Sequence, residues 1–219
     1  MNGKPANKTA IERLYQEIKK RTLSSAFMQD ECYHPESIAD ELGASRTQVL
    51  DALPRLAAEG LVITVPEDGF IPVCLSEESV RGKYELTRIV LLQELECLMP
   101  VTRSKLSECE PVARALNQLD RLNFVNGGVL ATYTDTIFAS IASLNDNTKA
   151  VSSIEHANSH LRYVRTLEAR QCPERVQKEL RRFCELLLAE CCEELAEGID
   201  EYHDRRVESL AVLLECLRS

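Results

Sequence analysis

The strongest constraint on the fold is a pair of short helix patterns, separated by a tight turn, between residues 35 and 60. Pro35 suits the first position of a helix, where no backbone N–H is needed, and Gly43 suits the left-handed conformation that ends one. Ser45 and Gln48 have the spacing of a capping box, in which each side chain satisfies a free backbone amide. The sequence therefore predicts one helix that ends at Gly43 and another that begins after Ser45 and runs to about residue 60.

A preceding helix is expected to pack against this pair. Thr9 and Glu12 also have capping-box spacing, which predicts a helix from about Thr9 to Leu23. The helix after Ser45 has an apolar stripe at Val49, Leu53 and Leu56. Its interior also contains Pro54, which removes a backbone hydrogen bond and is expected to bend the helix or end it early.

A β-hairpin is expected directly after the third helix. Residues 61–65 are apolar and mostly β-branched, residues 66–69 contain the proline and glycine typical of a turn, and residues 70–73 return as a second strand. Three helices followed by a hairpin predict a winged helix-turn-helix domain over residues 1–75. In such a domain the third helix enters a major groove of DNA and the hairpin tip touches the phosphate backbone.

The remainder of the chain, residues 76–219, is expected to form an all-α domain. Strand patterns disappear after residue 75 and helical periodicity continues to the end. The predicted helices span residues 77–99, 110–124, 129–144, 148–169, 173–197 and 199–217. The fold class is therefore mostly α, with a winged helix-turn-helix followed by a bundle of about six helices.

Composition narrows the location and the class of function. The chain carries a net charge of −9 and nine cysteines, and its N-terminus lacks an apolar secretory segment. These features predict reduced thiols in a cytoplasmic protein rather than disulfides, and no apolar run is long enough to span a membrane. The sequence has no glycine-rich nucleotide loop and no H-E-x-x-H or G-x-S-x-G motif, so an enzyme is not expected.

Residues 38–49, with the sequence IADELGASRTQV, resemble the DNA-binding domain of the GntR family of transcriptional regulators. The similarity in spacing continues through residues 59–62 and the wing glycine, Gly69. The all-helical remainder resembles the FCD ligand-binding domain of the FadR-type subgroup. The resemblance implies a homodimer that binds a palindromic operator in double-stranded DNA and responds to a small-molecule effector.

The same resemblance implies which residues contact DNA. These candidates are Ser45, Arg46, Thr47, Gln48 and Gly69. The chain departs from the family pattern where Glu36, Leu50 and Asp68 occupy positions that are usually basic. Residues 1–75 contain eight basic and eleven acidic side chains, and each lost phosphate contact weakens DNA binding. An alternative function is therefore a sensor or protein-interaction module with weak or lost DNA binding.

The resemblance also implies an effector site in the helical domain. Many FCD domains bind a divalent metal through an aspartate and several histidines, and the metal helps to hold a carboxylate effector. Here Asp135 matches, Ala139 replaces the first histidine, Arg182 replaces another, and His203 lies within one residue of the last. No cofactor or metal is therefore expected, and Asp135 and His203 are the only weak candidates for metal ligands.

The effector-binding candidates are Asp135, Arg182 and His203, with Arg182 available for an anionic ligand or, equally, a simple surface residue. A further pair, His156 and His160, is four residues apart on one helical face, a geometry that can hold a metal. The polar residues around this pair favour an ordinary solvated face instead.

Overall fold

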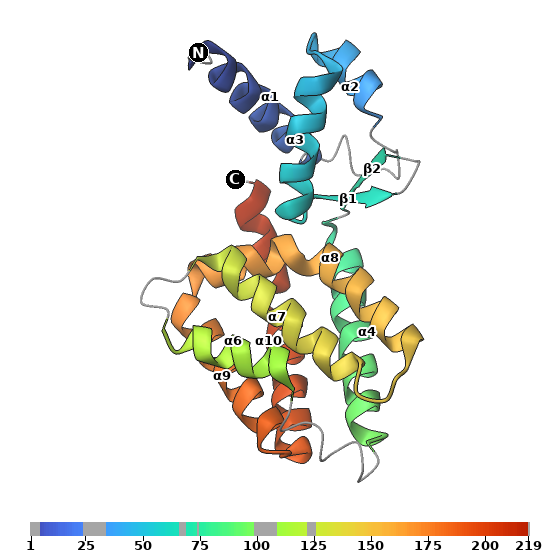
Figure 1. The fold of residues 1–219 in the computed structure, drawn as a ribbon, viewed down its shortest axis with the longest axis vertical. Helices are drawn as coiled ribbons and strands as arrows, with labels where there is room; N and C mark the ends of the chain where they lie inside the picture. Colours follow the sequence, from blue (N-terminus) through green and yellow to red (C-terminus); the bar gives the residue numbers. More distant parts are fainter. Residues whose placement is uncertain are drawn as a thin grey trace. The chain divides into compact units, whose positions relative to one another are not determined.

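The computed structural model describes residues 5–23, 34–65, 69–73, 75–98, 109–121 and 126–218. The chain divides into two compact units, Met1–Ser76 and Glu77–Ser219. Both are mostly helical, and a small two-stranded sheet lies in the first (Figure 1). Among the described residues, the helices are all too short or too polar to cross a membrane.

The first unit begins with α1, Pro5–Leu23, which packs against α3. The expected start at Thr9 is wrong, because the helix begins upstream, at Pro5. A proline in the first turn costs no hydrogen bond and has a backbone angle suited to a helix. The side chain of Glu12 contacts Gln16 and Arg55 rather than a helix start.

The two central helices of this unit confirm the turn predicted between them. They are α2, Pro35–Leu42, and α3, Arg46–Ala58. Gly43 adopts the left-handed conformation with φ +59°, where a residue with a Cβ atom would be strained. Pro54 does not end α3 early. It lies on the exposed side of the helix, where the Leu50 carbonyl that loses its partner can face water.

The predicted hairpin is present as β1, Val62–Val65, and β2, Gly69–Pro72. The strands are antiparallel, with Val62 opposite Pro72 and Val65 opposite Gly69. Gly69 has a φ of 95°, which explains why glycine begins the second strand. The rest of the predicted turn, including Asp68, lies outside the described residues.

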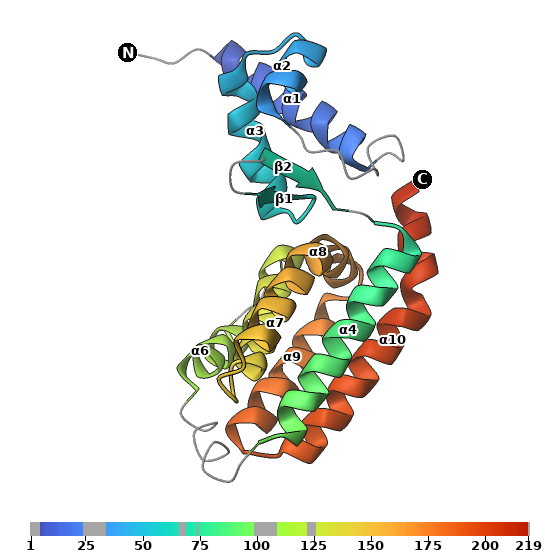
Figure 2. The same cartoon turned by 90° about the vertical axis from the view of Figure 1, so that its right-hand side faces the viewer.

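The second unit contains six described helices. They are α4, Glu77–Glu96; α6, Glu110–Leu119; α7, Gly127–Ala142; α8, Thr148–Gln171; α9, Pro173–Leu188; and α10, Cys192–Arg218. Helices α4 and α10 lie side by side, and α8 packs on both α7 and α4 (Figure 2). Residues of α4, α7, α8 and α10 therefore meet in the interior of this unit.

The boundary between the last two helices differs from the prediction. The sequence suggested a break at Gly198, but the chain turns at Ala189–Cys191, where Glu190 has a φ of 60°. Gly198 is buried inside α10, and a Cβ atom placed on it would lie 3.1 Å from Cε1 of Phe183. This glycine permits close packing of α10 on α9 and does not end a helix.

Candidate functional site

The N-terminal end of α3 exposes three of the predicted DNA-contact residues, Ser45, Arg46 and Thr47. Ser45 Oγ accepts a hydrogen bond from the backbone N–H of Gln48 at 3.3 Å, and Gln48 Oε1 accepts one from the Ser45 N–H at 2.9 Å. The predicted capping box is therefore confirmed. It occupies the Ser45 hydroxyl and the Gln48 side-chain oxygen, whereas the exposed side chains of Arg46 and Thr47 take no part in it. Gly69, the remaining candidate, is half-buried in the hairpin.

Arg46 is already bound to an acidic side chain. Its Nε donates to Glu36 on α2, and both side chains are about three-fifths exposed, at 61% and 60%. The hydrogen bond from Arg46 lowers the pKa of Glu36. A DNA phosphate that approaches Arg46 must therefore compete with a carboxylate of the same chain.

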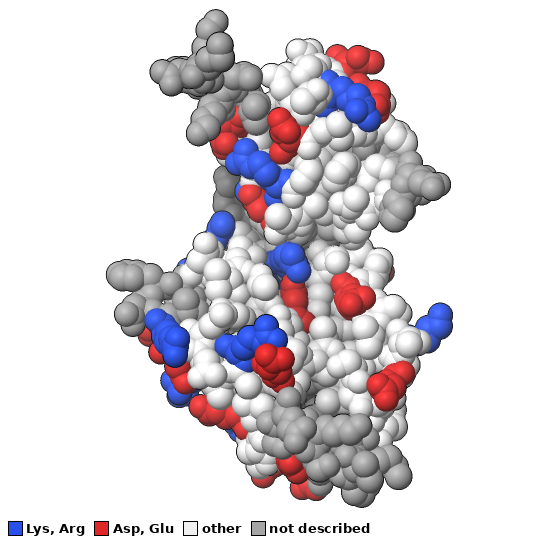
Figure 3. All heavy atoms as spheres, viewed as in Figure 1, with Lys and Arg blue, Asp and Glu red and all other residues white. Residues whose placement is uncertain are grey.

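Other basic side chains of this unit are paired in the same way. The further ion pairs are Lys19–Glu59, Arg21–Glu17, Arg21–Glu41 and Arg55–Glu12. Figure 3 shows basic and acidic side chains next to one another in this part of the chain. A basic side chain that is already paired with a carboxylate of its own chain displaces fewer counterions from DNA. Internal pairing therefore reduces the electrostatic contribution to DNA affinity.

The structure adds Arg13 to the candidate DNA contacts. Among the described residues it has no ion pair, and it lines a surface hollow of about 400 Å³ together with Gly43 and Gln48. It therefore places a positive charge beside the start of α3, in a hollow that Glu17 also lines. No local pattern in the sequence singles out Arg13, because its nearness to α3 depends on the packing of α1.

A second candidate site lies inside the helical unit, around Asp135 on α7. Its carboxylate accepts hydrogen bonds from Arg162 at 2.7 and 3.0 Å and from Arg165 at 2.7 Å. Asn158 supports the arrangement, because its Oδ1 accepts a second hydrogen bond from Nη1 of Arg165 at 2.7 Å. One carboxylate is therefore shared by two guanidinium groups, both from α8.

Arg165 is the most deeply buried cation of this cluster. Its side chain is only 2% exposed, yet its Nε and Nη2 atoms have no hydrogen-bond partner among the described residues. The guanidinium carbon lies 5.1 Å from the centre of the Phe138 ring. Unpartnered buried donors are rare, since each costs roughly 1–3 kcal/mol. Such an atom therefore suggests that the site accepts a further group.

His203 and Tyr84 contribute two more unpartnered polar atoms. The Nδ1 of His203 lies 2.7 Å from the Ile199 carbonyl oxygen, and its ring stacks on Phe138 with 5.7 Å between centroids. Its Nε2 atom and the Tyr84 hydroxyl are buried without partners. Burial lowers the pKa of His203 to about 3, so the ring is neutral at neutral pH, and burial raises the pKa of Tyr84.

Next to these residues, Arg206 forms a buried ionic network with two carboxylates, in which its Nε is close to Glu168 but not aligned for a hydrogen bond. Its Nε lies 2.9 Å from Glu168, its Nη2 lies 2.8 Å from Glu179, and its guanidinium stacks on the Tyr202 ring at 3.3 Å. Nη1 donates to the Tyr202 carbonyl. Because its partners are internal, we assign this network to packing of α8, α9 and α10 rather than to ligand binding.

The structure brings Asp135 and His203 into one buried cluster but leaves Arg182 exposed on α9. The cation inside the cluster is Arg165, which the sequence analysis missed. A usable signal was present: Arg165 is one turn from Leu161 and from Ala169, so it lies on the apolar face of α8.

The cluster does not fit the divalent metal that the family resemblance implied. Both oxygens of Asp135 are bound by guanidinium groups, and Ala139 supplies no ligand. Across the described residues, no group of three or more His, Cys, Asp or Glu side chains could hold a metal ion. A metal site needs several converging ligands, so Asp135 and His203 do not make one.

The pair His156 and His160 offers two of the ligands that a metal needs. Their ring centroids are 4.2 Å apart on the exposed side of α8. Burial and the nearby charge of Lys83 lower the pKa values of both rings. The positive charge of Lys83 disfavours a bound cation, which agrees with the polar-face interpretation.

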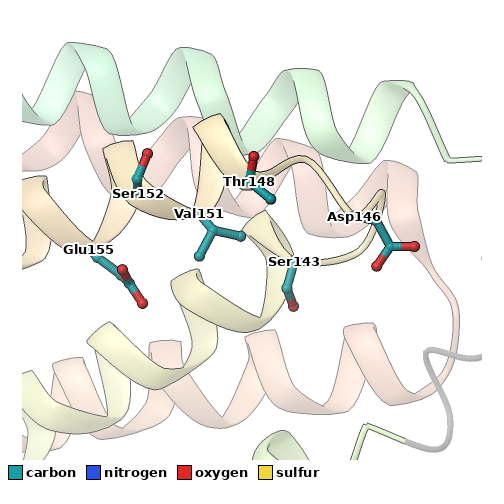
Figure 4. Close-up of a pocket in the computed structure, with 6 residues that line it drawn as sticks. All are labelled: Ser143, Asp146, Thr148, Val151, Ser152 and Glu155. Carbon is teal, nitrogen blue, oxygen red and sulfur yellow. The ribbon is translucent and has the colours of Figure 1, made fainter.

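A separate surface hollow of about 410 Å³ lies where α7 turns into α8 (Figure 4). It is lined by Ser143, Asp146, Thr148, Val151, Ser152 and Glu155. The two charged groups are carboxylates, so this hollow does not favour an anionic ligand.

The chain is similar to solved structures over nearly its whole length, with both units covered. The chain resembles a transcriptional regulator from Rhodococcus sp. RHA1 described as GntR, at 17% identity and a TM-score of 0.57 over 93% of this chain and 98% of that one. It also resembles Lar of Listeria monocytogenes, at 17% identity and a TM-score of 0.56 over 97% and 100% of the two chains. The chain has the fold of GntR-family transcriptional regulators.

A GntR family member from Pseudomonas syringae pv. tomato str. DC3000 has the same architecture, at 16% identity and a TM-score of 0.50 over 99% of this chain and 91% of that one. No model of a protein family matches the sequence, and no curated protein matches it. At these identities the comparison establishes the GntR fold, and residue roles are argued from the chain itself.

Proposed function

We propose that this protein is a DNA-binding transcriptional regulator that acts as a homodimer in the cytoplasm. The observation that carries the proposal is the winged helix-turn-helix, in which a capped recognition helix presents Arg46 and Thr47 to solvent. A two-fold symmetric dimer of such units matches an operator with palindromic half-sites. The similarity to GntR-fold regulators supports the same function.

The helical unit is proposed to bind a small anionic effector. Its interior holds Arg165, Tyr84 and His203 with buried polar atoms that lack partners among the described residues. A catalytic role has no support, because the described side chains do not place a nucleophile beside an activating base in this cluster. Effector binding in one unit would then be coupled to DNA binding in the other.

One observation favours a second function, a winged-helix interaction module with little DNA affinity. The basic side chains Lys19, Arg21, Arg46 and Arg55 are each paired with a glutamate of the same unit. The surface available to phosphates is therefore less positive than the number of cations suggests. A protein partner does not require a positive surface, whereas DNA does.

Selection from random double-stranded DNA at low salt separates the two functions. The regulator predicts enrichment of one sequence with two-fold symmetry, and a salt titration of that site by fluorescence anisotropy should show affinity falling steeply with salt concentration. Lack of enrichment at low salt would reject the regulator and favour the interaction module.

Replacing Arg46 with alanine is expected to weaken binding to the selected site by about tenfold or more, because a single base or phosphate contact is worth roughly 1–3 kcal/mol. The matched control is Arg55→Ala, which removes the same charge from the other end of α3, where Arg55 pairs with Glu12. Fluorescence anisotropy measures both variants. Equal losses for the two would show that Arg46 contributes only through net charge.

Replacing Glu36 with glutamine is expected to strengthen DNA binding by several-fold. The change frees the Arg46 guanidinium from an internal carboxylate and leaves it available to phosphate. Glu41→Gln is the control, since it removes the same charge from α2 at a residue that pairs with Arg21 rather than with Arg46. In the Arg46→Ala background the Glu36 gain should disappear. A gain that persists there would refute competition for Arg46.

A further inference from the structure

We propose that Arg165 holds the carboxylate of a small-molecule ligand on its Nε–Nη2 edge, that Tyr84 donates a third hydrogen bond, and that no divalent metal takes part. The inference rests on the proposed effector-binding function and specifies its chemistry. It also differs from the metal-assisted binding that the family resemblance implied.

The free edge of Arg165 has the geometry that a carboxylate requires. Nη1 is occupied by Asp135 and Asn158, at 2.7 Å each. Nε and Nη2 are the two remaining positions, and they point the same way along one edge of the planar guanidinium. This edge offers two parallel N–H groups spaced to match the two oxygens of a carboxylate.

The local charge also favours an anion. Asp135 is shared between Arg162 and Arg165, so one negative charge faces two positive ones. His203 is neutral at neutral pH because burial lowers its pKa to about 3. A bound carboxylate would balance the excess positive charge and satisfy donors that otherwise remain buried and unpaired.

Two further contacts define the rest of the site. The Tyr84 hydroxyl comes from α4, is buried, and lacks a partner among the described residues. Its ring lies 6.2 Å from that of His203, centroid to centroid, so the Tyr84 hydroxyl belongs to the same buried cluster. Phe138 lies against both Arg165 and His203, so an apolar part of the ligand would meet an aromatic ring.

A metal is not needed in this arrangement because Arg165 supplies the positive charge. In metal-assisted sites the cation sits between protein carboxylates or imidazoles and the ligand. Here Nη1 of Arg165 binds Asp135, and the Nε–Nη2 edge has no hydrogen-bond partner among the described residues. Arg165 can therefore supply the positive charge that a metal supplies in those sites. A divalent cation next to Arg165 and Arg162 would be repelled.

The free donors are closed off from solvent, so a ligand reaches them only when the surrounding helices move apart. Tyr84 lies on α4, the helix that follows the winged unit directly in the sequence. A carboxylate that bridges Tyr84 and Arg165 would therefore fix the position of α4 against α8. Ligand binding would thereby affect the position of the N-terminal end of α4, the helix that follows the DNA-binding unit in the sequence.

The test uses the full-length protein stripped of metals with EDTA, titrated by calorimetry with sodium acetate, sodium succinate and sodium benzoate. We expect saturable binding of at least one of these carboxylates, with sodium chloride at matched ionic strength giving none. Adding zinc or manganese should leave the affinity unchanged. Binding that appears only after metal is added, or no binding of any of the three, would overturn the proposal.

Two variants test the assigned contacts. Tyr84→Phe removes only a hydroxyl without a partner, so it should fold as well as the parent while it weakens carboxylate binding about tenfold or more. Arg165→Lys keeps the charge but loses the two-donor edge, and a larger loss is expected. Arg114→Lys, the matched control, makes the same change on the exposed face of α6 and should bind normally. Unchanged affinity in Tyr84→Phe and Arg165→Lys would refute the assignment.

This experiment is independent of the DNA measurements. If carboxylates do not bind but the selected operator is bound, the inference fails and the regulator stands. If carboxylates bind through Arg165 but DNA selection yields no sequence, the site stands and the DNA-binding function fails.

Discussion

Replacing Arg206 with alanine is expected to lower the free energy of unfolding by about 3–5 kcal/mol, because removal of one partner strands buried opposite charges. The Arg206 side chain is 3% exposed, and its partners Glu168 and Glu179 are 8% and 15% exposed. Without the guanidinium, Glu168 and Glu179 would lose their buried partner and keep only the more exposed Arg175 and Arg205. Urea unfolding of the full-length protein, followed by circular dichroism, measures the loss.

Arg175→Ala is the matched control for this variant. Arg175 binds the same carboxylate, Glu168, at 2.8 Å, but its side chain is 42% exposed. Solvent screens such a pair, so its removal should cost less than about 1 kcal/mol. Adding Glu168→Gln to Arg206→Ala should recover part of the loss, because it removes one stranded charge. Equal effects of the Arg206 and Arg175 variants would refute the buried network.

The sequence predicted the winged unit well because local interactions determine its turns. Gly43 ends α2 through its left-handed conformation, and Ser45 with Gln48 begins α3 through the capping box. Each depends on residues within a few positions of one another, so a pattern in the sequence is sufficient. The fold class is confirmed for the same reason.

The predictions that failed depend on contacts between distant residues. The predicted helices 173–197 and 199–217 are separated at Gly198, but α10 continues through this residue, and Phe183 of α9 packs against it. The capping-box pattern at Thr9 and Glu12 also occurs inside α1, where Glu12 pairs with Arg55 of α3. Neither contact is visible in the local sequence, because both arise only when helices pack.

The candidate site residues also divide into those that the local sequence predicts and those that depend on packing between helices. Arg46 and Thr47 are exposed as expected because the capping pattern places them on the first turn of α3. In the helical unit the sequence selected Asp135 and His203, but the buried cation beside Asp135 is Arg165 rather than the exposed Arg182. Correspondence with family positions favoured Arg182, whereas the apolar neighbours of Arg165 on α8 predict its burial.

The stability of this protein is expected to fall steeply below pH 6.5 because of His203. Burial lowers its pKa to about 3 in the folded protein, whereas the unfolded chain has the ordinary value of 6.5. Between these values the unfolded state binds more protons, so the free energy of unfolding rises with pH and is lost as pH falls. The contribution of this one residue changes by about 1.4 kcal/mol per pH unit in that window.

His203→Phe tests this expectation, since phenylalanine keeps a ring beside Phe138 and Tyr202 but does not titrate. Urea unfolding from pH 7 to pH 4 should show the variant becoming more stable relative to the parent as pH falls. Carboxylates titrate in both proteins, so the difference between the two profiles isolates His203. His156→Gln is the control, because its ring is exposed and its replacement should change the parent profile much less than His203→Phe does. Parallel profiles for His203→Phe and the parent would show that His203 is not held neutral by burial.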